Sequence, residues 1–243
     1  MSPLKIVWLC RHDTLRGGPL IHKVIKAIMP SRVHGYLKYL LQYREAEKRA
    51  AAIAQKNKHK IESLMQGSQP IKLEMGAGCI RGIPGWTYVD ANGQCDLTLD
   101  LGQSLPFGDN TVDCIYSSHL LEHFGYSDLL RFLSECLRIL KPDGKFSAAV
   151  PDASIFLRAY HDPEAFNPDI YCRYGPAYRH NSKIDYVNYI AYMDGHHKYM
   201  FDEDSLLEVL INAGFRNVKS RRYDAVLDME SRDFQSIYAE AEK

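Results

Sequence analysis

The alternation of apolar and polar residues divides the chain into a long helical segment followed by an α/β pattern. Residues 36–65 contain no Pro or Gly and are rich in Ala, Lys, Glu and Gln, which predicts one long helix that ends before Gly67 and Pro70. Short apolar runs typical of strands follow at residues 71–75, 87–90, 97–101, 112–117 and 145–150. Alternation of strands with helical or loop segments predicts a parallel sheet covered by helices.

The second half of the pattern closes the sheet. Leucines at positions 129, 130, 133, 137 and 140 have helical spacing and predict a helix over 126–140, which Lys141-Pro142-Asp143-Gly144 ends. Residues 204–213 predict another helix, capped by Gly214. Residues 215–223 and 234–241 predict two closing strands.

Between these parts lies an aromatic segment, residues 152–202. Eight tyrosines and three phenylalanines fall between positions 156 and 201. Tyr186, Tyr189, Ile190 and Met193 recur at i, i+3, i+4 and i+7, which predicts the core-facing side of a helix. We expect this segment to form a cap inserted into the α/β domain.

Composition is typical of a soluble globular protein. The 243 residues suffice for one large α/β domain with additions, and 46% of them are hydrophobic and 25% charged. No apolar run approaches the roughly 18 residues of a membrane span, and the first apolar run is too short for a secretory signal. The six cysteines form no C-x-x-C pair, so we expect reduced thiols in a cytoplasmic protein.

Charge is unevenly placed along the chain. Residues 1–60 hold 13 Lys or Arg against three acids, whereas the whole chain has a net charge of zero. One interpretation is a solvated, basic helical extension, residues 1–66, packed on a more acidic domain, residues 67–243. The other is peripheral contact of this basic helix with an anionic membrane or a protein. A homodimer stays open, and nothing points to nucleic acid.

A glycine loop follows the first predicted strand. Gly76-Ala77-Gly78 has no third glycine and no P-loop lysine, so nothing is built to hold phosphates. Asp90 comes twelve residues after Gly78, whereas a dinucleotide fold has its acid about 20 residues on. Glu74, Asp90 and Asp100 stand at or near three predicted strand ends. An adenosine ligand that has no phosphates and bears a positive charge fits this set of acids.

At this point a family resemblance becomes visible. It rests on LEMGAG (73–78), GWTYVD (85–90), DL (100–101), LPFGDN (105–110), YSSHLLEH (116–123), LRILKPDG (137–144), VPD (150–152), HKYMF (197–201) and SIYAEA (236–241). With these motifs the chain resembles the class I S-adenosylmethionine-dependent methyltransferases, particularly small predicted methyltransferases of polysaccharide and secondary-metabolite pathways. The resemblance runs from about residue 71 to the C-terminus, and residues 1–66 lie outside it.

The resemblance implies a Rossmann-like, doubly wound, mostly parallel seven-stranded sheet of order 3-2-1-4-5-7-6. It also implies S-adenosyl-L-methionine as cofactor, with the glycine loop beneath its methionyl part, Asp90 on the ribose, and Asp100 with Leu101 beside the adenine. The cofactor-binding residues expected are Glu74, Gly76, Ala77, Gly78, Asp90, Ala91, Asp100, Leu101, Ser117 and His119. Two departures are Cys79, where the class often has glycine, and a first crossover that is mostly loop.

A competing metal motif overlaps the site. His119-Leu120-Leu121-Glu122-His123 matches H-x-x-E-H, the inverted zinc-peptidase signature, in which two histidines on one helix bind zinc. Here the motif directly follows a predicted strand, and Phe124-Gly125 interrupts the helix. We therefore predict no metal site, and we expect Glu122 and His123 to organise the loop.

Methyl transfer to a hydroxyl needs alignment and a base, and histidine has a suitable pKa. The predicted catalytic residues are His197 first and then His119, although His197 could equally only bind a backbone group. His123, Asp152, His196 and Tyr199 are predicted to bind the substrate. The tyrosine-rich insert suits a sugar or an aromatic polyol, because it combines stacking surface with hydroxyl groups.

The function predicted is therefore methyl transfer to a hydroxyl of a small molecule or glycan. Two alternatives stay open: a non-catalytic S-adenosylmethionine-binding module that acts with a partner, and an NAD(P)-type oxidoreductase. The second lacks the phosphate-binding fingerprint and any Tyr-x-x-x-Lys pair.

Overall fold

The computed structural model describes residues 31–179 and 181–243. The predictions for the first apolar run, for Cys10 and for the basic residues before position 31 lie outside this part of the chain. The predicted long helix is α3 (Ser31–Gln66). It spans the division between two compact units, Met1–Ala54 and Gln55–Lys243. Among the described residues, no helix is both long enough and apolar enough to cross a membrane.

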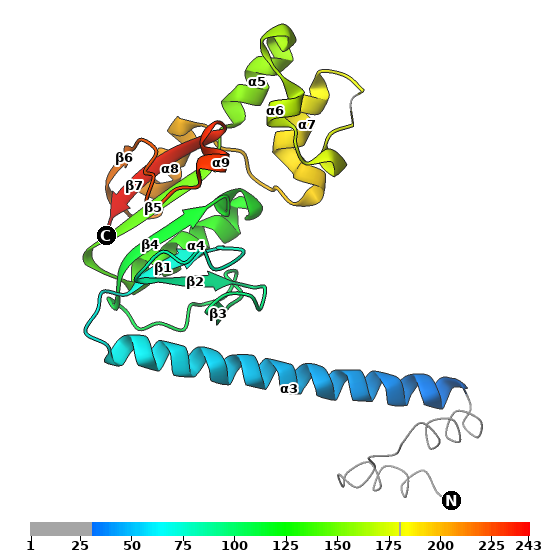
Figure 1. Ribbon diagram of the computed structural model, residues 1–243, viewed down its shortest axis with the longest axis vertical. Coiled ribbons are helices and arrows are strands. Elements are labelled where there is room, and N and C mark those ends of the chain that lie inside the picture. Colours follow the sequence, from blue (N-terminus) through cyan, green and yellow to red (C-terminus); the bar gives the residue numbers. More distant parts are fainter. Residues whose placement is uncertain (1–30, 180) are drawn as a thin grey trace, which may run out of the picture. The chain divides into compact units, whose positions relative to one another are not determined.

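Seven strands form one mixed sheet of order β3-β2-β1-β4-β5-β7-β6 (Figure 1). They are β1 (Lys72–Met75), β2 (Trp86–Asp90), β3 (Leu97–Thr98), β4 (Val112–Ser118), β5 (Leu140–Pro151), β6 (Arg216–Ser220) and β7 (Ser236–Glu242). The first five strands pair in parallel, and β7 is antiparallel to both β5 and β6. The predicted fold class and strand order are confirmed.

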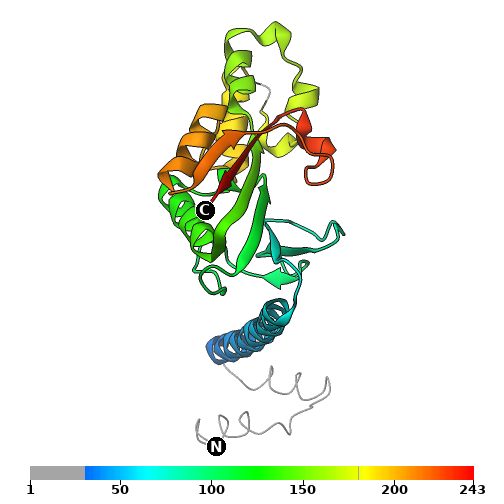
Figure 2. The same cartoon turned by 90° about the vertical axis from the view of Figure 1, so that its left-hand side faces the viewer.

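Helices α4 (Tyr126–Ile139) and α8 (Glu203–Asn212) lie side by side on one face of this sheet (Figure 2). The leucine face of α4 is buried against the strands, with Leu129 and Leu133 fully inaccessible. Asp202 caps α8 by accepting a hydrogen bond from the Ser205 backbone N–H, in a complete capping box. A short helix, α9 (Glu230–Asp233), precedes β7. The periodicity of the sequence thus found both long helices of the domain.

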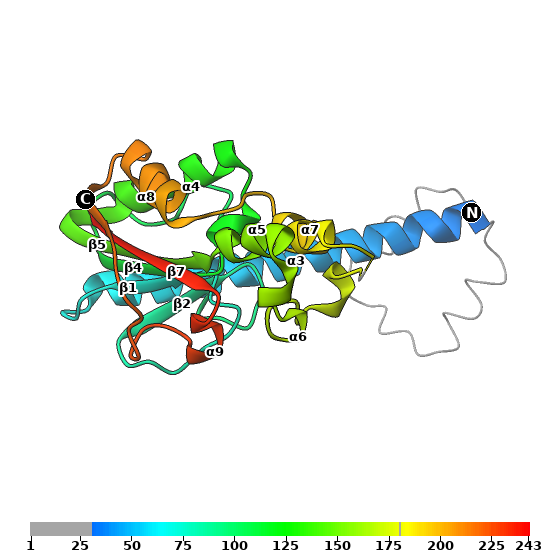
Figure 3. The same ribbon diagram turned by 90° about the horizontal axis from the view of Figure 1, so that it is seen from above.

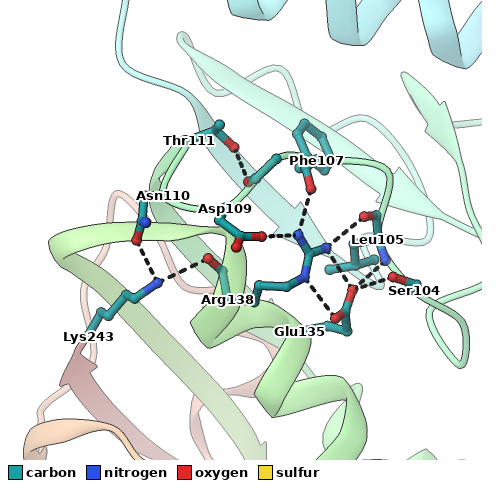
Figure 4. A network of polar contacts seen from close by, with 10 residues as sticks. Ser104, Leu105, Phe107, Asp109, Asn110, Thr111, Glu135, Arg138 and Lys243 are labelled. Atoms are coloured by element: carbon teal, nitrogen blue, oxygen red, sulfur yellow. Dashed lines mark hydrogen bonds and ion pairs between the residues drawn. The ribbon is translucent and has the colours of Figure 1, made fainter.

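Arg138 of the LRILKPDG motif connects α4 with the LPFGDN loop (Figure 4). Its guanidinium donates to the carbonyls of Leu105 and Phe107 and to the carboxylates of Asp109 and Glu135, at 2.8–2.9 Å. The hydrogen bonds from Arg138 lower the pKa of Glu135 to about 2. The LPFGDN loop is therefore held onto the end of α4 by charge-assisted hydrogen bonds.

The aromatic segment forms a small body of its own beyond the sheet (Figures 1 and 3). It contains α5 (Ala153–His161), η2 (Pro163–Ala165), α6 (Pro168–Tyr171), η3 (Gly175–Ala177), α7 (Ile184–Tyr192) and η4 (Met193–Gly195). Phe156, Phe166, Tyr189 and Ile190 form its core, with Tyr186 and Met193 partly buried against them. The predicted core face is confirmed. A parallel bridge between Asp152 and Phe201 joins the two ends of the insert.

The last turns of α3 belong to the second unit. The Asn57 side chain donates to the Thr98 carbonyl at 2.7 Å and accepts from the Thr98 N–H at 3.0 Å, so that it pairs with β3 as a neighbouring strand would. Lys56 donates to the Cys95 carbonyl at 3.0 Å. Ile61 and Leu64 pack partly buried against the sheet core. The domain boundary at residue 66 stays a prediction, and residues 55–66 contact β3 and the sheet.

Candidate functional site

The parallel register brings three strand ends together. Met75 of β1 lies beside Val89 of β2 and Ser117 of β4, so the residues that follow these strands meet at one edge of the sheet. Backbone N–H groups of Gly76 and Ala77 both donate to the Val89 carbonyl, at 2.8 and 3.2 Å. Ligands of open α/β sheets bind at this carboxyl edge.

Asp90 orients the glycine loop. Its Oδ2 accepts from the Gly78 N–H and its Oδ1 from the Asn92 N–H, both at 2.9 Å. The Asn92 side chain donates in turn to the Gly78 carbonyl at 2.7 Å. Each carboxylate oxygen keeps a second lone pair, which leaves Asp90 able to accept from ribose hydroxyls as well. Ala91 is exposed beside it.

The two glycines of the loop are required for different reasons. Both have positive φ, +70° at Gly76 and +68° at Gly78, where other residues are strained. A Cβ on Gly76 would lie 2.6 Å from Leu120 Cδ1, so the protein itself fills that space. A Cβ on Gly78 would have nothing within 4 Å. Gly78 is therefore the position at which a ligand can approach the backbone freely.

Glu74 is bound by an arginine that the sequence did not single out. Its buried carboxylate accepts from Arg81 Nη2 at 2.7 Å and Nε at 3.1 Å. Arg81 Nη1 also donates to the Leu227 carbonyl at 2.9 Å. Burial raises the pKa of Glu74, and the hydrogen bond from Arg81 opposes that rise. Arg81 thus connects the end of β1 with the loop before α9.

The acid after β3 lies in a loop, because β3 ends at Thr98. Asp100 is exposed, and its Oδ1 accepts from the Gly102 N–H at 2.9 Å. Leu101, next to it, is buried. The Leu99 N–H donates to the Asp90 carbonyl at 3.0 Å, which brings this loop beside the acid of β2.

The end of β4 carries polar groups with few partners. Ser117 is fully buried, and its Oγ has no hydrogen-bond partner among the described residues. His119 has a φ of +52°, an uncommon conformation often found at functional sites. Its Nε2 lies 2.8 Å from Ser236 Oγ, which itself donates to the Arg232 carbonyl. Nε2 must therefore be the protonated nitrogen of His119, and its Nδ1 carries the lone pair.

The H-x-x-E-H motif does not form the helix of a zinc peptidase. Only Leu121–His123 of the motif is helical, as the 3-10 helix η1, and Gly125 stands between it and α4, which begins at Tyr126. The Glu122 carbonyl accepts from the N–H groups of Lys198 and Tyr199, at 2.8 and 3.2 Å, which ties η1 to the chain that leaves the insert. The Glu122 carboxylate has no hydrogen-bond partner among the described residues, and burial raises its pKa to about 8.

Two further histidines meet at η1. His197 is buried and its Nδ1 lies 2.8 Å from the Ile190 carbonyl, the backbone contact that the sequence left open. His123 Nδ1 lies 2.9 Å from the His196 carbonyl. The rings of His123 and His197 are 5.1 Å apart and nearly perpendicular. Burial lowers the pKa of His197 to about 4 and that of His119 to about 3, so both are neutral at pH 7.

The remaining predicted substrate residues fall into two groups. His196 is exposed, with its ring 6.2 Å from Tyr174, and Tyr199 packs on Tyr126 at 5.7 Å. Both lie next to His197 in the segment that contacts η1. Asp152 caps α5 by accepting from the Ser154 N–H at 2.8 Å, which gives it a structural task at the start of the insert.

Sequence patterns missed Arg81 and Arg232 and gave Glu122 only a loop-organising role. Arg232 donates to the Ser118 carbonyl at 3.2 Å, and its charge is felt by Glu74, Glu122 and His119. Neither arginine belongs to a recognisable motif: Arg81 reaches back to Glu74 and across to Leu227, and Arg232 reaches Ser118 far away in the sequence. Two hollows on the described surface, one between α3 and β4 and one between α5 and α6, contain no residue of the glycine loop or of η1.

Residues 88–148 match a family model described as a methyltransferase domain. The matched segment runs from β2 into β5 and includes Asp90, Asp100, Ser117, His119 and Glu122. This match supports the resemblance of the chain to the S-adenosylmethionine-dependent methyltransferases. No match was found among curated proteins.

Solved methyltransferase structures are similar to the chain at low identity. An enzyme from Archaeoglobus fulgidus has 16% identity and a TM-score of 0.44, over 84% of this chain and 100% of that one. The 1,6-didemethyltoxoflavin-N1-methyltransferase of Burkholderia thailandensis has 17% identity and a TM-score of 0.45, over 96% and 93%. These similarities carry no information on the substrate of this chain.

The residues at the carboxyl edge fit the cofactor of this methyltransferase family. Gly78 leaves open space beside the backbone, and Asp90 keeps lone pairs for hydroxyl donors. Ser117 offers a buried hydroxyl that has no partner within the described chain. When bound, S-adenosyl-L-methionine supplies the methyl group from its sulfonium. Asp90, Gly78 and Ser117 would hold it, with Asp100 and Leu101 beside the adenine.

Proposed function

We propose that this methyltransferase acts on a hydroxyl group of a small molecule or glycan. The observation that carries the proposal is the group of three histidines around η1, next to the glycine loop. Leu120, at the start of η1, packs against Gly76, so the histidines lie close to the loop that would hold the methyl donor. A hydroxyl acceptor needs a proton acceptor there, and histidine is the side chain most often used.

Hydrogen bonds fix which ring nitrogen can accept that proton. His197 donates its Nδ1–H to the Ile190 carbonyl, because a carbonyl can only accept. Its Nε2 therefore carries the lone pair. His119 is fixed the other way round, with its lone pair on Nδ1. The proposed base is His197 first and His119 second. Both are weak bases in this buried setting, so alignment supplies the larger share of the rate.

The acceptor class rests on the surroundings of these histidines. Exposed Tyr174 and His196 place an aromatic surface with polar groups beside η1. Aromatic faces stack on sugar rings and phenols, and their polar atoms bind hydroxyl groups. This supports a sugar or an aromatic polyol as acceptor, with Tyr199 and His123 as further contacts.

The test combines binding with turnover in the full chain. Titration with S-adenosylmethionine, S-adenosylhomocysteine and NAD should show binding of the first two only. Incubation with a panel of monosaccharides, glycosides and phenols, followed by measurement of S-adenosylhomocysteine formed, should then find a hydroxyl acceptor. Binding without turnover on any acceptor would favour a non-catalytic module, and turnover on amines alone would contradict the proposed acceptor.

Histidine variants separate the roles at the site. His197→Asn should lower the single-turnover rate by roughly 10²–10⁴ and leave the affinity for S-adenosylhomocysteine nearly intact. His119→Asn should have the same kind of effect, and His161→Asn, an exposed position in α5, serves as the matched control. Full activity in both the His197 and His119 variants would show that no histidine acts as the base.

A further inference from the structure

Three side chains at and near η1 place possible metal-ligand atoms close together. One ligand atom each of Glu122, His123 and His197 lies within 4.8 Å of the others. Glu122 Oε1 is 3.9 Å from His123 Nε2. The three residues come from two distant parts of the chain, because η1 precedes the insert and His197 lies near the end of it. Only tertiary folding brings them together.

Both histidines are held with a lone pair on Nε2. The Ile190 carbonyl accepts from His197 Nδ1, and the His196 carbonyl accepts from His123 Nδ1, at 2.8 and 2.9 Å. A backbone carbonyl that accepts the Nδ1–H fixes the tautomer in this way in metal sites, where it also orients the ring. Each Nε2 is then neutral and able to bind a cation.

The carboxylate between them lacks any other partner. Glu122 is 2% exposed, and neither of its oxygens accepts a hydrogen bond from the described residues. A buried carboxylate without partners lowers stability by several kcal/mol in an apolar setting, whereas a bound cation satisfies it. His119 Nδ1, also 3.9 Å from Glu122 Oε1, carries a lone pair and does not supply a proton. Arg232, the nearby cation, is directed at Ser118.

We propose that Glu122, His123 and His197 bind one divalent first-row transition-metal ion. Two imidazoles and one carboxylate suit Zn²⁺, Co²⁺, Mn²⁺ or Fe²⁺, whereas Mg²⁺ and Ca²⁺ prefer oxygen ligands alone. Ligand atoms around tetrahedral Zn²⁺ are about 3.3 Å apart, given bonds of about 2.0–2.1 Å. The cluster must therefore contract by about 1.5 Å at most, which side-chain rotation can supply.

The site has an open position. The His123 side chain is 41% exposed, so one side of the ion would face the solvent or a ligand. Three protein ligands with one free position are typical of catalytic rather than structural zinc. Its role rests on the proposed function: the ion would hold the oxygen of the acceptor hydroxyl and lower the pKa of that group. His197 would then be a ligand, which leaves His119 as the candidate base.

This site differs from the zinc-peptidase pattern that the sequence suggested. That pattern would use His119 and His123 on one helix, with Glu122 as the base. Here the positive φ of His119 turns its ring towards Ser236, and His197 takes its place as a candidate ligand. The sequence predicts no metal site because H-x-x-E-H is not part of a long helix. The alternative ligand, His197, lies far from this motif in the sequence.

Metal titration tests the proposal without any use of enzymatic activity. The full chain is treated with a chelator and titrated with Co²⁺, whose visible absorption reports bound ion, and Zn²⁺ then competes for it. We expect one equivalent to bind. Because loss of residues around metal ligands already costs about 10–100-fold in affinity, loss of a ligand in Glu122→Gln or His123→Asn should weaken binding by more than about 100-fold.

Controls make each outcome decisive. His196→Asn replaces an exposed neighbouring histidine outside the cluster and should bind as wild type does. His197→Asn should lose binding as well, with far-UV circular dichroism to check its fold. His123 is half-buried, whereas Glu122 and His197 are buried, so His123→Asn should disturb the packing least. Two results would overturn the site: no Co²⁺ binding by the wild type, or wild-type affinity in both Glu122→Gln and His123→Asn. S-adenosylhomocysteine titration of the same samples tests the proposed function separately.

Discussion

The two sides of the carboxyl edge differ in how their charged groups are satisfied. On the β1–β3 side, Glu74 is bound by Arg81, and Asp90 and Asp100 each accept backbone N–H groups. On the β4 side, the carboxylate of Glu122 and the hydroxyl of Ser117 have no hydrogen-bond partner in the part of the chain that the structure describes. The first side is rigidly prepared for its ligand, whereas the second keeps unsatisfied polar groups, a common feature of sites that bind charge.

The largest loss of stability is expected when the buried carboxylate on the β1–β3 side loses its partner. Arg81→Met would leave Glu74 buried without its partner, and removal of one member of a buried ion pair costs about 3–5 kcal/mol. Urea unfolding should show this loss in the free energy of unfolding. The double variant Glu74→Gln, Arg81→Met should recover most of it. A loss below about 1 kcal/mol in the single variant would show that Glu74 does not depend on Arg81.

The two glycines of the loop give the next largest difference. Gly76→Val adds a side chain against Leu120 at a positive φ, so we expect a loss of about 2–4 kcal/mol in unfolding free energy. Gly78→Ala meets no atom within 4 Å and should lose only about 1–2 kcal/mol, through its positive φ alone. Chemical denaturation of both variants checks this, and equal losses would contradict the packing of Leu120 on the loop.

On the β4 side, removal of the charge of the buried Glu122 should stabilise the protein. Glu122→Gln keeps the shape and removes a buried carboxylate without partners, so the free energy of unfolding in the presence of a chelator should rise by about 1–2 kcal/mol. Glu164→Gln, an exposed position in η2, should change it by less than about 0.5 kcal/mol. If Glu122→Gln were destabilised instead, the carboxylate would have partners in solution and the difference between the two sides would disappear.

The smallest loss of stability is expected at β3, the edge strand that Asn57 contacts. Asn57→Ala removes both hydrogen bonds to Thr98, and we expect a loss of about 1 kcal/mol in stability. Deletion of residues 1–54 keeps these bonds and should leave the affinity for S-adenosylhomocysteine within a few-fold. Deletion of residues 1–66 removes Asn57 as well. A deletion of 1–54 that abolishes binding in a folded protein would place the first unit in the cofactor site.

The fold was predictable because its signals are local. Helix α4 follows from leucines at helical spacing, and the insert from prolines and aromatics between Asp152 and Phe201, which the structure joins by a bridge. The strand order came from the family resemblance and is confirmed. Glycine and acid spacing also placed Gly78 and Asp90 together, and their hydrogen bond shows that proximity.

The contacts within the site were less predictable on both sides, because they depend on the folded structure. No pattern indicates that Arg81 reaches Glu74, or that Leu120 fills the space at Gly76. The H-x-x-E-H motif brought Glu122 and His123 together, but the third member of the cluster, His197, lies near the end of the insert, more than 70 residues further along the chain. Residues that act across such separations leave no periodic or spaced signal in a single sequence.

The central claim is that Asp90 and the glycine loop hold S-adenosylmethionine, and calorimetric titration with S-adenosylhomocysteine tests it most directly. Wild type should bind one equivalent, and Asp90→Ala should weaken binding by about 1.5–3 kcal/mol, roughly 10- to 150-fold. Asn92→Ala, which removes the contacts of its side chain to the Gly78 carbonyl and the Gln94 N–H but leaves Asp90 in place, should lose less than about tenfold. Unchanged affinity in Asp90→Ala, or no binding by wild type, would contradict the account.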